Sequence, residues 1–489
     1  MSLQYLEEFG TSRRDSAKFP KLKTACTISV PMTLPIGLRS PALIQTLSLV
    51  ADPIAFFDRA AAHYGDTFTT RVLGLNSPPV VFLSNPDAIQ AVFTTGADAF
   101  EFGKVTDVFR PLVGNESLIM QQGAKHQRQR QLLMPALHRE QLHSQGHLIC
   151  QLTQKRMIDW SVGNEIAVRS EMSEISLQVI LQVVFGLVPG ARYEQLKQLL
   201  AQLLEAITSP LYSTQFFFPM LQKNLGEWSP WGKFLEQMAQ IDALIYAEIS
   251  DRRSQSLQNR TDILSVLMTA QDEQGESMGD QELRDQLMTL LLLGHETTAS
   301  GLTWAFYWLH RHPECLVRLH QEFDQLGEDP DPVALSQAPY LTAVCKEALR
   351  VYPIALISQP RKVKRTVEIE GYTYQPGTVL IPCIYLAHRR AETYEHADRF
   401  DPDRFLQRKF SAYEYFPFGG GSRSCVGMAL SLFEMKLVLA TVLAWYDFET
   451  NLDRAIRPAR RGITFVPPDT FRLKLVHDRA TLPELIHTP

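Results

Sequence analysis

The chain has 489 residues, of which 45% are apolar and 21% are charged, so it is long and apolar enough to bury a large core. Its formal net charge of -5 provides no overall basic field, which argues against nucleic acid as a partner and restricts docking to local patches. The six cysteines are widely scattered, with no CxxC pair and no zinc-finger spacing, so they form no disulfide framework.

The N-terminal segment contains early charges and lacks the apolar stretch of a signal peptide. We therefore expect no secretory signal, no transmembrane anchor and a reducing, cytoplasmic setting. Transient peripheral contact with a membrane stays open at this stage. Prolines recur between Pro20 and Pro53, which predicts an extended lead-in over residues 1–45, followed by one catalytic domain over residues 46–489.

Beyond the lead-in, short β-strands are predicted at residues 67–72 and 80–83, and a second hairpin at residues 366–381, each bounded by glycine and proline. Apolar residues recur at three- and four-residue spacing over segments 140–205, 232–252, 280–327 and 425–446, which predicts helices. The predicted fold class is therefore mainly α with a small β region. Internal repeats and Gly/Ser linkers are absent from the sequence.

Residues 287–309 are almost wholly apolar and are long enough to span a bilayer. Gly294, His295 and Glu296 interrupt the stretch, and a carboxylate is rare inside a membrane. We see no second segment of this kind. The sequence thus predicts a long helix buried in a soluble core.

Segment 416–427 reads FPFGGGSRSCVG and leads into a helical pattern. A lone cysteine is usually a small apolar core residue. Here the glycines at 419–421 would let the backbone pass close to a flat ligand, and Cys425 precedes a helix, where backbone N–H groups stabilise a thiolate. A thiolate is a good ligand for iron, so Cys425 is the candidate metal ligand.

The spacing of Phe418, Gly421, Arg423, Cys425 and Gly427 resembles the FxxGxRxCxG signature of the cytochrome P-450 superfamily. The resemblance implies the P-450 fold, a soluble bacterial-like heme-thiolate monooxygenase, and heme b (iron protoporphyrin IX) as cofactor with Cys425 bound to its iron. It also implies that Phe418 packs beside the sulfur and that Arg423 pairs with a heme propionate. Gly427 would let the next helix pass close to the porphyrin.

Glu347 and Arg350 lie three residues apart on a predicted helix and share a face. Such a pair alone is usually a surface salt bridge of little energetic value. Segment 400–405 resembles the family's PERF segment, and this resemblance makes Arg404 the third member of a structural Glu-Arg-Arg network behind the cysteine loop. Asp403 stands where the family more often has Glu.

Residues 294–298, GHETT, are similar to the family's (A/G)Gx(D/E)TT oxygen-binding motif. A small residue and a threonine hydroxyl open the helix locally, and an adjacent carboxylate relays protons. By this resemblance Thr297 positions the oxygen or a water, and Glu296 belongs to the relay. The alternative is a helix-kinking Ser/Thr cluster without a catalytic role. Leu293 departs from the family's Ala or Gly, and its effect on the pocket stays open.

Two heme propionates require cationic partners. His126 and Arg130 match the family's (W/H)xxxR pattern, and Arg361 matches a further propionate-binding position. Without this resemblance, a basic helix at these positions would be read as a solvated face. The resemblance implies that all three residues bind the cofactor.

The regions that contact substrate in this family are mostly apolar here, which favours a large lipophilic substrate such as a fatty acid or a terpenoid. The aromatic residues 216–218, with Trp228 and Trp231, are equally consistent with ordinary core or with a surface that touches lipid. The candidate substrate contacts are Phe102, Val105, Phe109, Leu112, Phe216, Phe217, Phe218, Ile354, Ala355, Leu356, Ile357, Ile463 and Phe465.

The implied reaction is O2-dependent hydroxylation, in which one oxygen atom enters the substrate and the other leaves as water. No dinucleotide motif follows a predicted strand, so electrons would come from an external ferredoxin-type donor with its reductase. A cationic face with Lys125, Arg128 and Arg139 is the expected docking site. The alternatives are a peroxygenase or isomerase on the same fold, against which Glu296 and Thr297 argue, and a non-catalytic heme sensor.

Overall fold

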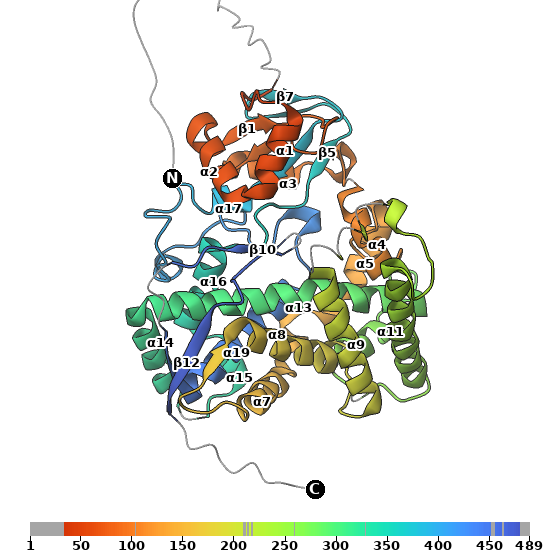
Figure 1. Ribbon diagram of the computed structural model, residues 1–489, viewed down its shortest axis with the longest axis vertical. Coiled ribbons are helices and arrows are strands. Elements are labelled where there is room, and N and C mark those ends of the chain that lie inside the picture. Colours follow the sequence, from red (N-terminus) through yellow and green to blue (C-terminus); the bar gives the residue numbers. More distant parts are fainter. Residues whose placement is uncertain are drawn as a thin grey trace, which may run out of the picture.

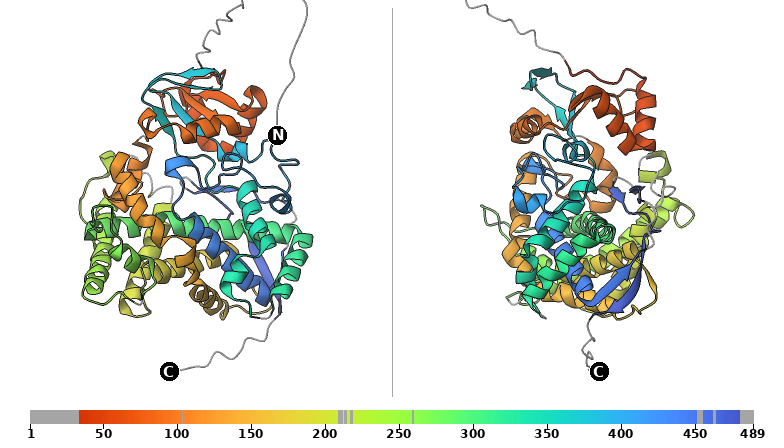
Figure 2. Two further views of the ribbon diagram at one scale, coloured as in Figure 1. Left: turned by 180° about the vertical axis from the view of Figure 1, so that it is seen from behind. Right: turned by 90° about the vertical axis from the view of Figure 1, so that its left-hand side faces the viewer.

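The computed structural model describes residues 34–102, 104–208, 212, 215–216, 219–258, 260–327, 329–450, 455–461 and 464–479. A helix-rich lobe and a smaller lobe that carries the main β-sheet make up the molecule (Figure 1). The long helix α13 (Asp280–Arg311) crosses the middle of the molecule, and the right-hand view of Figure 2 looks along it with other helices around it. This is the mainly α fold with a small β region that the sequence predicts.

The main sheet lies in the smaller lobe and has the strand order β1-β2-β8-β5-β3. β2 pairs with β8 in parallel, and the other neighbours are antiparallel. Every residue of β2 and β8 is buried, as expected of continuous apolar runs. The strands predicted at residues 67–72 and 80–83 are confirmed. The bounds are β1 (Thr67–Thr70), β2 (Val80–Leu83), β3 (Phe100–Glu101), β5 (Arg361–Val363) and β8 (Val379–Pro382).

The hairpin predicted at residues 366–381 is only partly correct. β6 (Val367–Ile369) and β7 (Tyr372–Tyr374) form an antiparallel pair around Gly371, whose positive φ of 76° suits the turn. β8 instead leaves this hairpin and joins the main sheet beside β2. Its apolar sequence is explained by the buried parallel pairing rather than by a two-stranded hairpin.

The helices that pack most extensively on α13 are α8 (Val168–Val179), α16 (Pro339–Val351) and α19 (Met428–Trp445). A π-helical turn, Ile180–Val184, continues α8. The other helices of the described chain are α1 (Ala42–Ala51), α2 (Pro53–Tyr64), α3 (Pro86–Thr94), α4 (Arg110–Val113), α5 (Gly123–Ala136), α6 (Arg139–His143), α7 (Gly146–Met157), α9 (Ala191–Thr208), α11 (Pro230–Arg253), α12 (Ile263–Thr269), α14 (Pro313–Leu326), α15 (Pro332–Ser336), α17 (Ile384–Ala387) and α18 (Arg404–Gln407).

Two small sheets complete the described structure. β4 (Glu165–Ala167), β12 (Arg472–Asp478) and β9 (Tyr446–Glu449) form one, with β12 in the centre. β10 (Ala459–Arg461) and β11 (Thr464–Val466) form the other. The C-terminal part of the chain is thereby attached to the helical lobe.

The predicted lead-in contributes to the smaller lobe at its C-terminal end. Gly37 bridges to Thr69, and α1 begins at Ala42. Pro20 and Pro31 lie outside the described residues. The division of the chain at residue 45 stays a prediction.

Within the described residues, one helix is long and apolar enough to cross a membrane, judged by length and composition alone. That helix is α19, and 67% of its apolar window is buried inside the protein. The expectation that residues 287–309 are the single such segment is therefore wrong. The expectation that residues 287–309 form part of a long helix in the protein interior is confirmed by α13, in which Leu302 and Trp304 are fully buried.

Candidate functional site

Cys425 lies at the end of the glycine loop, just before α19 begins. Its backbone N–H donates to the Phe418 carbonyl over 2.9 Å and closes the loop. Burial raises the pKa of the thiol, whereas the backbone N–H groups of Gly427 and Met428 and the charge of Arg130 lower it. Cys425 is exposed, as are Gly421 and Ser422 in the same loop. The structure thus presents an accessible sulfur at a helix N-terminus, where a thiolate can bind metal.

The structure explains the glycines of the loop differently from the sequence analysis, which expected a flat ligand close to the backbone. A Cβ at Gly420 would lie 2.1 Å from the Phe93 ring of α3, so this backbone packs against protein rather than against a flat ligand. Gly419 and Gly421 have φ of 67° and 69°, which favours glycine. Phe93, which the sequence analysis did not single out, therefore packs directly against the backbone of the loop at Gly420.

Three arginines converge near the cysteine loop, and each donates to backbone oxygen. Arg130 donates to the Ser424 carbonyl over 2.7 Å. Arg361 donates to the Gly420 carbonyl over 3.0 Å, and Arg423 donates to the Gln121 carbonyl over 2.8 Å. Among the residues that the structure describes, no carboxylate forms an ion pair with Arg130, Arg361 or Arg423.

The pKa values reflect this excess of positive charge. Burial and the charge of Arg423 lower the pKa of Arg361 to about 10, and burial and the charge of Arg130 lower that of Arg423 to about 10. Burial and the charges of Arg423 and Arg130 lower the pKa of His126 to about 4, so its imidazole is neutral at pH 7. The site holds one buried and two half-buried guanidinium groups without a counter-charge from the described residues.

Phe102 covers these cations. The guanidinium of Arg423 lies 4.4 Å from the centroid of the Phe102 ring, and that of Arg361 lies 5.7 Å from it. The sequence suggested Phe102 as a substrate contact, and the structure places it on the arginines instead. Its position in a loop between β3 and the next helical turn gave no sequence signal for this contact.

These residues are suited to a flat, dianionic, metal-bearing cofactor. Buried Arg361 and half-buried Arg130 and Arg423 supply positive charge for two carboxylates, and His126 adds a neutral polar group. Cys425 supplies a soft sulfur ligand for iron. The structure brings all of the predicted cofactor-binding residues to one region, and their contacts with the cofactor stay a prediction.

The predicted Glu-Arg-Arg network is confirmed. Arg350 donates to both carboxylate oxygens of Glu347 over 2.7 Å, and Arg404 donates to Glu347 over 3.0 Å. The remaining Arg350 donors bind backbone carbonyls, including that of His388 over 2.8 Å. Asp403, the departure from the family pattern, pairs with Arg318 instead. Glu347 and Arg350 are fully buried, so this network fixes structure and is closed to a substrate.

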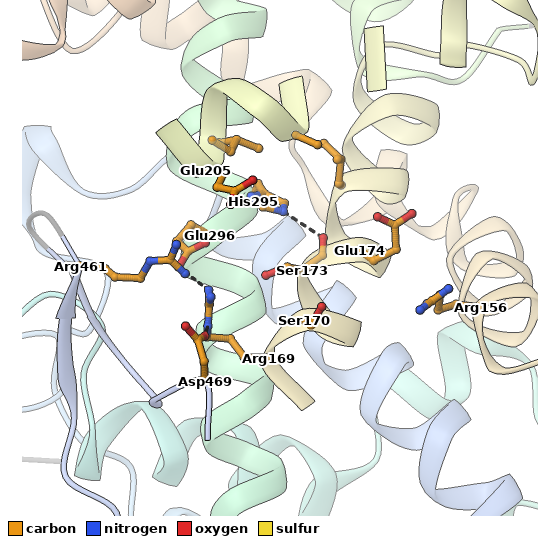
Figure 3. A pocket seen from close by; sticks show the side chains of 13 residues that line it. Arg156, Arg169, Ser170, Ser173, Glu174, Glu205, His295, Glu296, Arg461 and Asp469 are labelled. Carbon is orange, nitrogen blue, oxygen red and sulfur yellow. Dashed lines mark hydrogen bonds and ion pairs between the residues drawn. The ribbon is translucent and has the colours of Figure 1, made fainter. Parts of the chain in front are cut away.

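The Thr297 hydroxyl donates to the Leu293 carbonyl over 2.6 Å, which is a back-bond within continuous helix α13. The neighbouring Glu296 lies within ion-pair distance of two arginines from other elements. Its carboxylate accepts from Arg169 of α8 over 3.2 Å and lies 3.8 Å from Arg461 of β10 (Figure 3). The sequence gave no indication of this ion pair.

A cavity of about 540 Å³ opens beside Glu296, between α8, α9 and α13. Figure 3 shows Glu296 and Arg461 near Arg169, with Asp469 beside that arginine. Arg169 also forms an ion pair with Asp469. Glu296, the predicted relay carboxylate, is therefore held at a polar pocket. Its ion pair with Arg169 must break before the Glu296 side chain can move.

The candidate substrate contacts fall into different environments. Phe216 is core: its ring centroid lies 5.1 Å from that of Phe234 and 5.9 Å from that of Trp231. Trp228, in contrast, is 95% exposed. Phe465 donates its N–H to the Ile354 carbonyl over 2.8 Å, which joins two of the predicted regions. Phe217, Phe218 and Ile463 lie outside the described residues, as does the side chain of Val105.

The predicted cationic docking face is smaller than expected. Arg128 donates to Asp272 over 2.5 Å and to Glu282 over 2.8 Å, so its charge is neutralised inside the protein. Lys125 is half-exposed and pairs with Glu116 over 2.5 Å. Arg139 is exposed. The inclusion of Arg128 in the docking face is therefore wrong, because partners far along the chain bind it.

A mainly α fold, an exposed cysteine before a helix and a cluster of arginines without a carboxylate partner in the described part of the chain define a heme-thiolate protein. The family model described as Cytochrome P450 matches residues 36–475, and the chain belongs to the cytochrome P450 family. As a member of this family it is a heme b-dependent monooxygenase, an oxidoreductase of the P450 type.

The curated relatives and solved structures agree. Cytochrome P450 135B1 of Mycobacterium tuberculosis is 34% identical over 445 residues, which cover 91% of this chain and 92% of the relative. Cytochrome P450 138 of Mycobacterium tuberculosis is 31% identical over 451 residues, covering 92% and 98%. A retinoic acid-bound cyanobacterial CYP120A1 superposes with a TM-score of 0.77 at 25% identity, covering 91% of this chain and 99% of that chain. The cytochrome P450DA heme domain has the same fold, with a TM-score of 0.75, 21% identity and coverage of 92% and 99%.

Proposed function

We propose that this protein hydroxylates a lipophilic substrate, inserting one oxygen atom from O2 with electrons from an external ferredoxin-type donor. The observation that carries the proposal is the exposed Cys425 beside buried Arg361 and half-buried Arg130 and Arg423, none of which has a carboxylate partner among the described residues. When bound, the heme supplies the iron at which O2 is activated, and the Cys425 thiolate favours O–O bond cleavage.

The chain's own residues have separate parts in this proposal. Arg130, Arg361 and Arg423 would bind the two propionates, and Phe102 screens Arg361 and Arg423 from water. Thr297 carries a hydroxyl at the turn of α13 that resembles the oxygen-binding motif, where it would orient oxygen or a water. Glu296 exchanges protons with the pocket once its ion pair with Arg169 opens.

A lipophilic substrate is supported by the apolar side chains of the candidate contacts. Leu112, Ile354, Leu356 and Phe465 are all buried and apolar, as expected for a pocket that takes up a fatty acid or a terpenoid. The structural relative CYP120A1 is described as bound to retinoic acid, which is an isoprenoid carboxylic acid. We propose a substrate of this lipophilic class.

A ferredoxin-type donor is supported by the surface of α5. A cavity of about 490 Å³ there is lined by Arg130, Met134 and His138 among others, and exposed Arg139 follows it. Substituting Lys125 and Arg139 with Gln should raise the KM for a ferredoxin in a salt-sensitive manner. An unchanged KM would contradict this docking face. Equal turnover with a flavodoxin-type donor would contradict the assignment of the donor to the ferredoxin class.

A cytoplasmic protein with peripheral membrane contact is the proposed location. Leu43, Ile44, Leu47 and Val50 of α1 are about half exposed or more, and they supply an apolar face of the kind that rests on lipid. Co-sedimentation with anionic vesicles tests this contact. Substituting Leu43 and Leu47 with Ser should reduce the fraction of protein that sediments with the vesicles. Equal sedimentation of the wild type and this variant would contradict membrane contact through α1.

The first experiment is the absorption difference spectrum of the dithionite-reduced protein with carbon monoxide. We expect a strongly red-shifted Soret band that Cys425→Ser abolishes. Absence of heme, or a band typical of histidine ligation, would contradict the thiolate assignment. Turnover with hydrogen peroxide alone, compared with reductant and O2, then separates a monooxygenase from a peroxygenase or isomerase. Thr297→Ala should uncouple turnover and release peroxide, whereas a heme sensor would show no such effect.

A further inference from the structure

His388 directly follows α17 and is completely buried. Ile384 and Ala387 of α17 pack in the core of the smaller lobe, whereas α16 belongs to the helix-rich lobe (Figure 1). Arg350 of α16 donates to the His388 carbonyl over 2.8 Å. The backbone of His388 is therefore bound to the Glu-Arg-Arg network where the two lobes meet.

The imidazole of His388 accepts a hydrogen bond from the first residue of the cysteine loop. The Phe416 N–H donates to Nε2 over 3.0 Å. Because a backbone N–H only donates, Nε2 carries no proton, and the neutral ring has its proton on Nδ1. Burial and the charges of Arg350 and Arg389 hold the pKa of His388 well below its ordinary value of 6.5. The ring is therefore a neutral acceptor at pH 7.

Aromatic rings fix the orientation of this imidazole. The Tyr415 ring is stacked on it, with 5.3 Å between the ring centroids and an interplanar angle of 16°. The rings of Phe416 and Tyr394 meet it edge-on, with centroids at 5.5 Å and 6.4 Å. Nδ1 of His388 is buried and has no hydrogen-bond partner among the residues that the structure describes. The ring thus provides an acceptor for Phe416 while its own N–H is left without one.

From Phe416, backbone hydrogen bonds of the loop lead to the cysteine. The Phe416 carbonyl accepts from the Gly419 N–H over 2.9 Å, and the Phe418 carbonyl accepts from the Cys425 N–H over 2.9 Å. The Phe416 ring also packs edge-on against Phe93, which contacts the loop backbone, with 5.6 Å between the ring centroids. A displacement of Phe416 would therefore be transmitted along the loop to Cys425.

We propose that His388 sets the position of the Cys425 sulfur at the heme iron by anchoring the start of the cysteine loop to the Glu-Arg-Arg network. The inference rests on the proposed role of Cys425 as the iron ligand. His388 acts through the loop backbone and is a positioning residue. Tyr415 adds to the anchor, since its hydroxyl donates to the Lys346 carbonyl of α16 over 3.0 Å.

The competing interpretation is that the His388 ring only fills space among its aromatic neighbours. Two substitutions separate the acceptor from the packing. His388→Leu keeps an apolar side chain at this position but leaves the Phe416 N–H buried and unpaired, which is costly. His388→Gln carries an amide oxygen that can take the place of Nε2. The proposal therefore requires that Gln restores what Leu loses.

The first test is hydrogen–deuterium exchange of the heme-loaded enzyme, measured by mass spectrometry of overlapping peptides. Pro417 has no N–H, so peptides that end on either side of Phe416 resolve its amide. We expect slow exchange of this amide in the wild type and in His388→Gln, and roughly tenfold faster exchange in His388→Leu. Rapid exchange in the wild type would overturn the proposal, and that measurement decides even if His388→Leu yields no soluble protein.

The second test is the state of the iron–sulfur bond at equal heme content. His388→Leu should lower the ratio of thiolate to non-thiolate carbon monoxide complex by roughly tenfold, the order expected when one buried N–H loses its acceptor. It should also shift or broaden the iron–sulfur stretching band in resonance Raman spectra, and His388→Gln should restore both. Tyr394→Phe is the matched control, because it removes the 3.0 Å hydrogen bond to the Glu414 carbonyl from the same ring cluster and leaves the acceptor in place.

An unchanged ratio and an unchanged iron–sulfur band in His388→Leu would contradict the proposal. Equal losses in His388→Leu and His388→Gln, or a loss of the same size in Tyr394→Phe, would show that packing and not the acceptor is responsible, which also overturns it. Failure of the proposed role of Cys425 is distinct from these outcomes, because the wild-type protein itself would then lack the thiolate spectrum and the iron–sulfur band.

Discussion

The protein contains two groups of buried or half-buried arginines that differ in where their counter-charge comes from. Arg350 and Arg404 share the carboxylate of Glu347, which is fully buried with them. Arg361 and Arg423 lie in the cysteine-loop group and bind backbone carbonyls with no carboxylate among the described residues. A buried charge without a partner is costly. The first group therefore completes the fold by itself, and the second reserves its charge for an anionic ligand.

The largest expected effect follows from removing the shared carboxylate. Glu347→Gln leaves Arg350 buried without its counter-charge, so the free energy of unfolding should fall by about 3–5 kcal/mol. Urea denaturation followed by circular dichroism measures it, with the soluble yield as a second readout. A loss below about 1 kcal/mol would show that the two groups do not differ in this way.

Removing an arginine of the cysteine-loop group should weaken heme binding without lowering the stability of the heme-free protein. Arg423→Gln should weaken heme binding by about 10- to 100-fold, because a charge-assisted hydrogen bond contributes about 1.5–3 kcal/mol. The heme-free protein should be no less stable, since burial and the charge of Arg130 already disfavour the Arg423 cation. Heme transfer to apomyoglobin measures retention, with Arg318→Gln as the surface control. Equal heme retention in both variants would contradict the assignment.

The cation cluster also predicts a pH dependence. Burial and neighbouring arginines lower the folded-state pKa of His126 to about 4, from an ordinary value of 6.5. In this window the unfolded chain binds more protons, so stability is fully present above pH 6.5 and decreases as the pH falls towards 4. The steepest contribution is about 1.4 kcal/mol per pH unit. Urea unfolding of heme-free protein between pH 4.5 and 7.5 should be flatter for His126→Gln, and parallel curves would exclude the contribution.

The smallest effect is expected at Asp403, next to the compensated group. Its carboxylate pairs with exposed Arg318, while Arg404 keeps its bond to Glu347. Asp403→Asn should reduce the free energy of unfolding by less than about 1 kcal/mol. A thermal unfolding series with Asp403→Glu as partner checks this. A loss as large as that of Glu347→Gln would make Asp403 part of the buried network.

The sequence predicted those parts of the site that depend on short spacing. Glu347 and Arg350 share a helix face at three-residue spacing, and the cysteine loop is contiguous, so both were visible as local patterns. The ion pair of Glu296 with Arg169 joins residues that are 127 apart in the chain. No local pattern reports such a pair, because it depends on how α8 and α13 pack.

Two of the errors of interpretation have related causes. Arg128 resembled a free surface cation, since its partner Asp272 lies 144 residues away. The apolar run of β8 has the same pattern in a hairpin as in a buried parallel pair, and only its neighbour β2 decides between them. The sequence gave no signal for the contacts that Phe93 and Phe102 make, because the partner of an aromatic side chain is decided only in the folded chain.

The burial of α19 has a consequence for synthesis of the chain. This apolar helix follows Cys425 and is made late, yet it packs against α7, α13 and α16, which emerge from the ribosome much earlier. Until residues 428–445 have been translated, those helices expose the apolar surfaces that α19 covers. Folding of the helical lobe is therefore completed only near the end of translation, and chains that terminate before α19 should be bound by chaperones or aggregate.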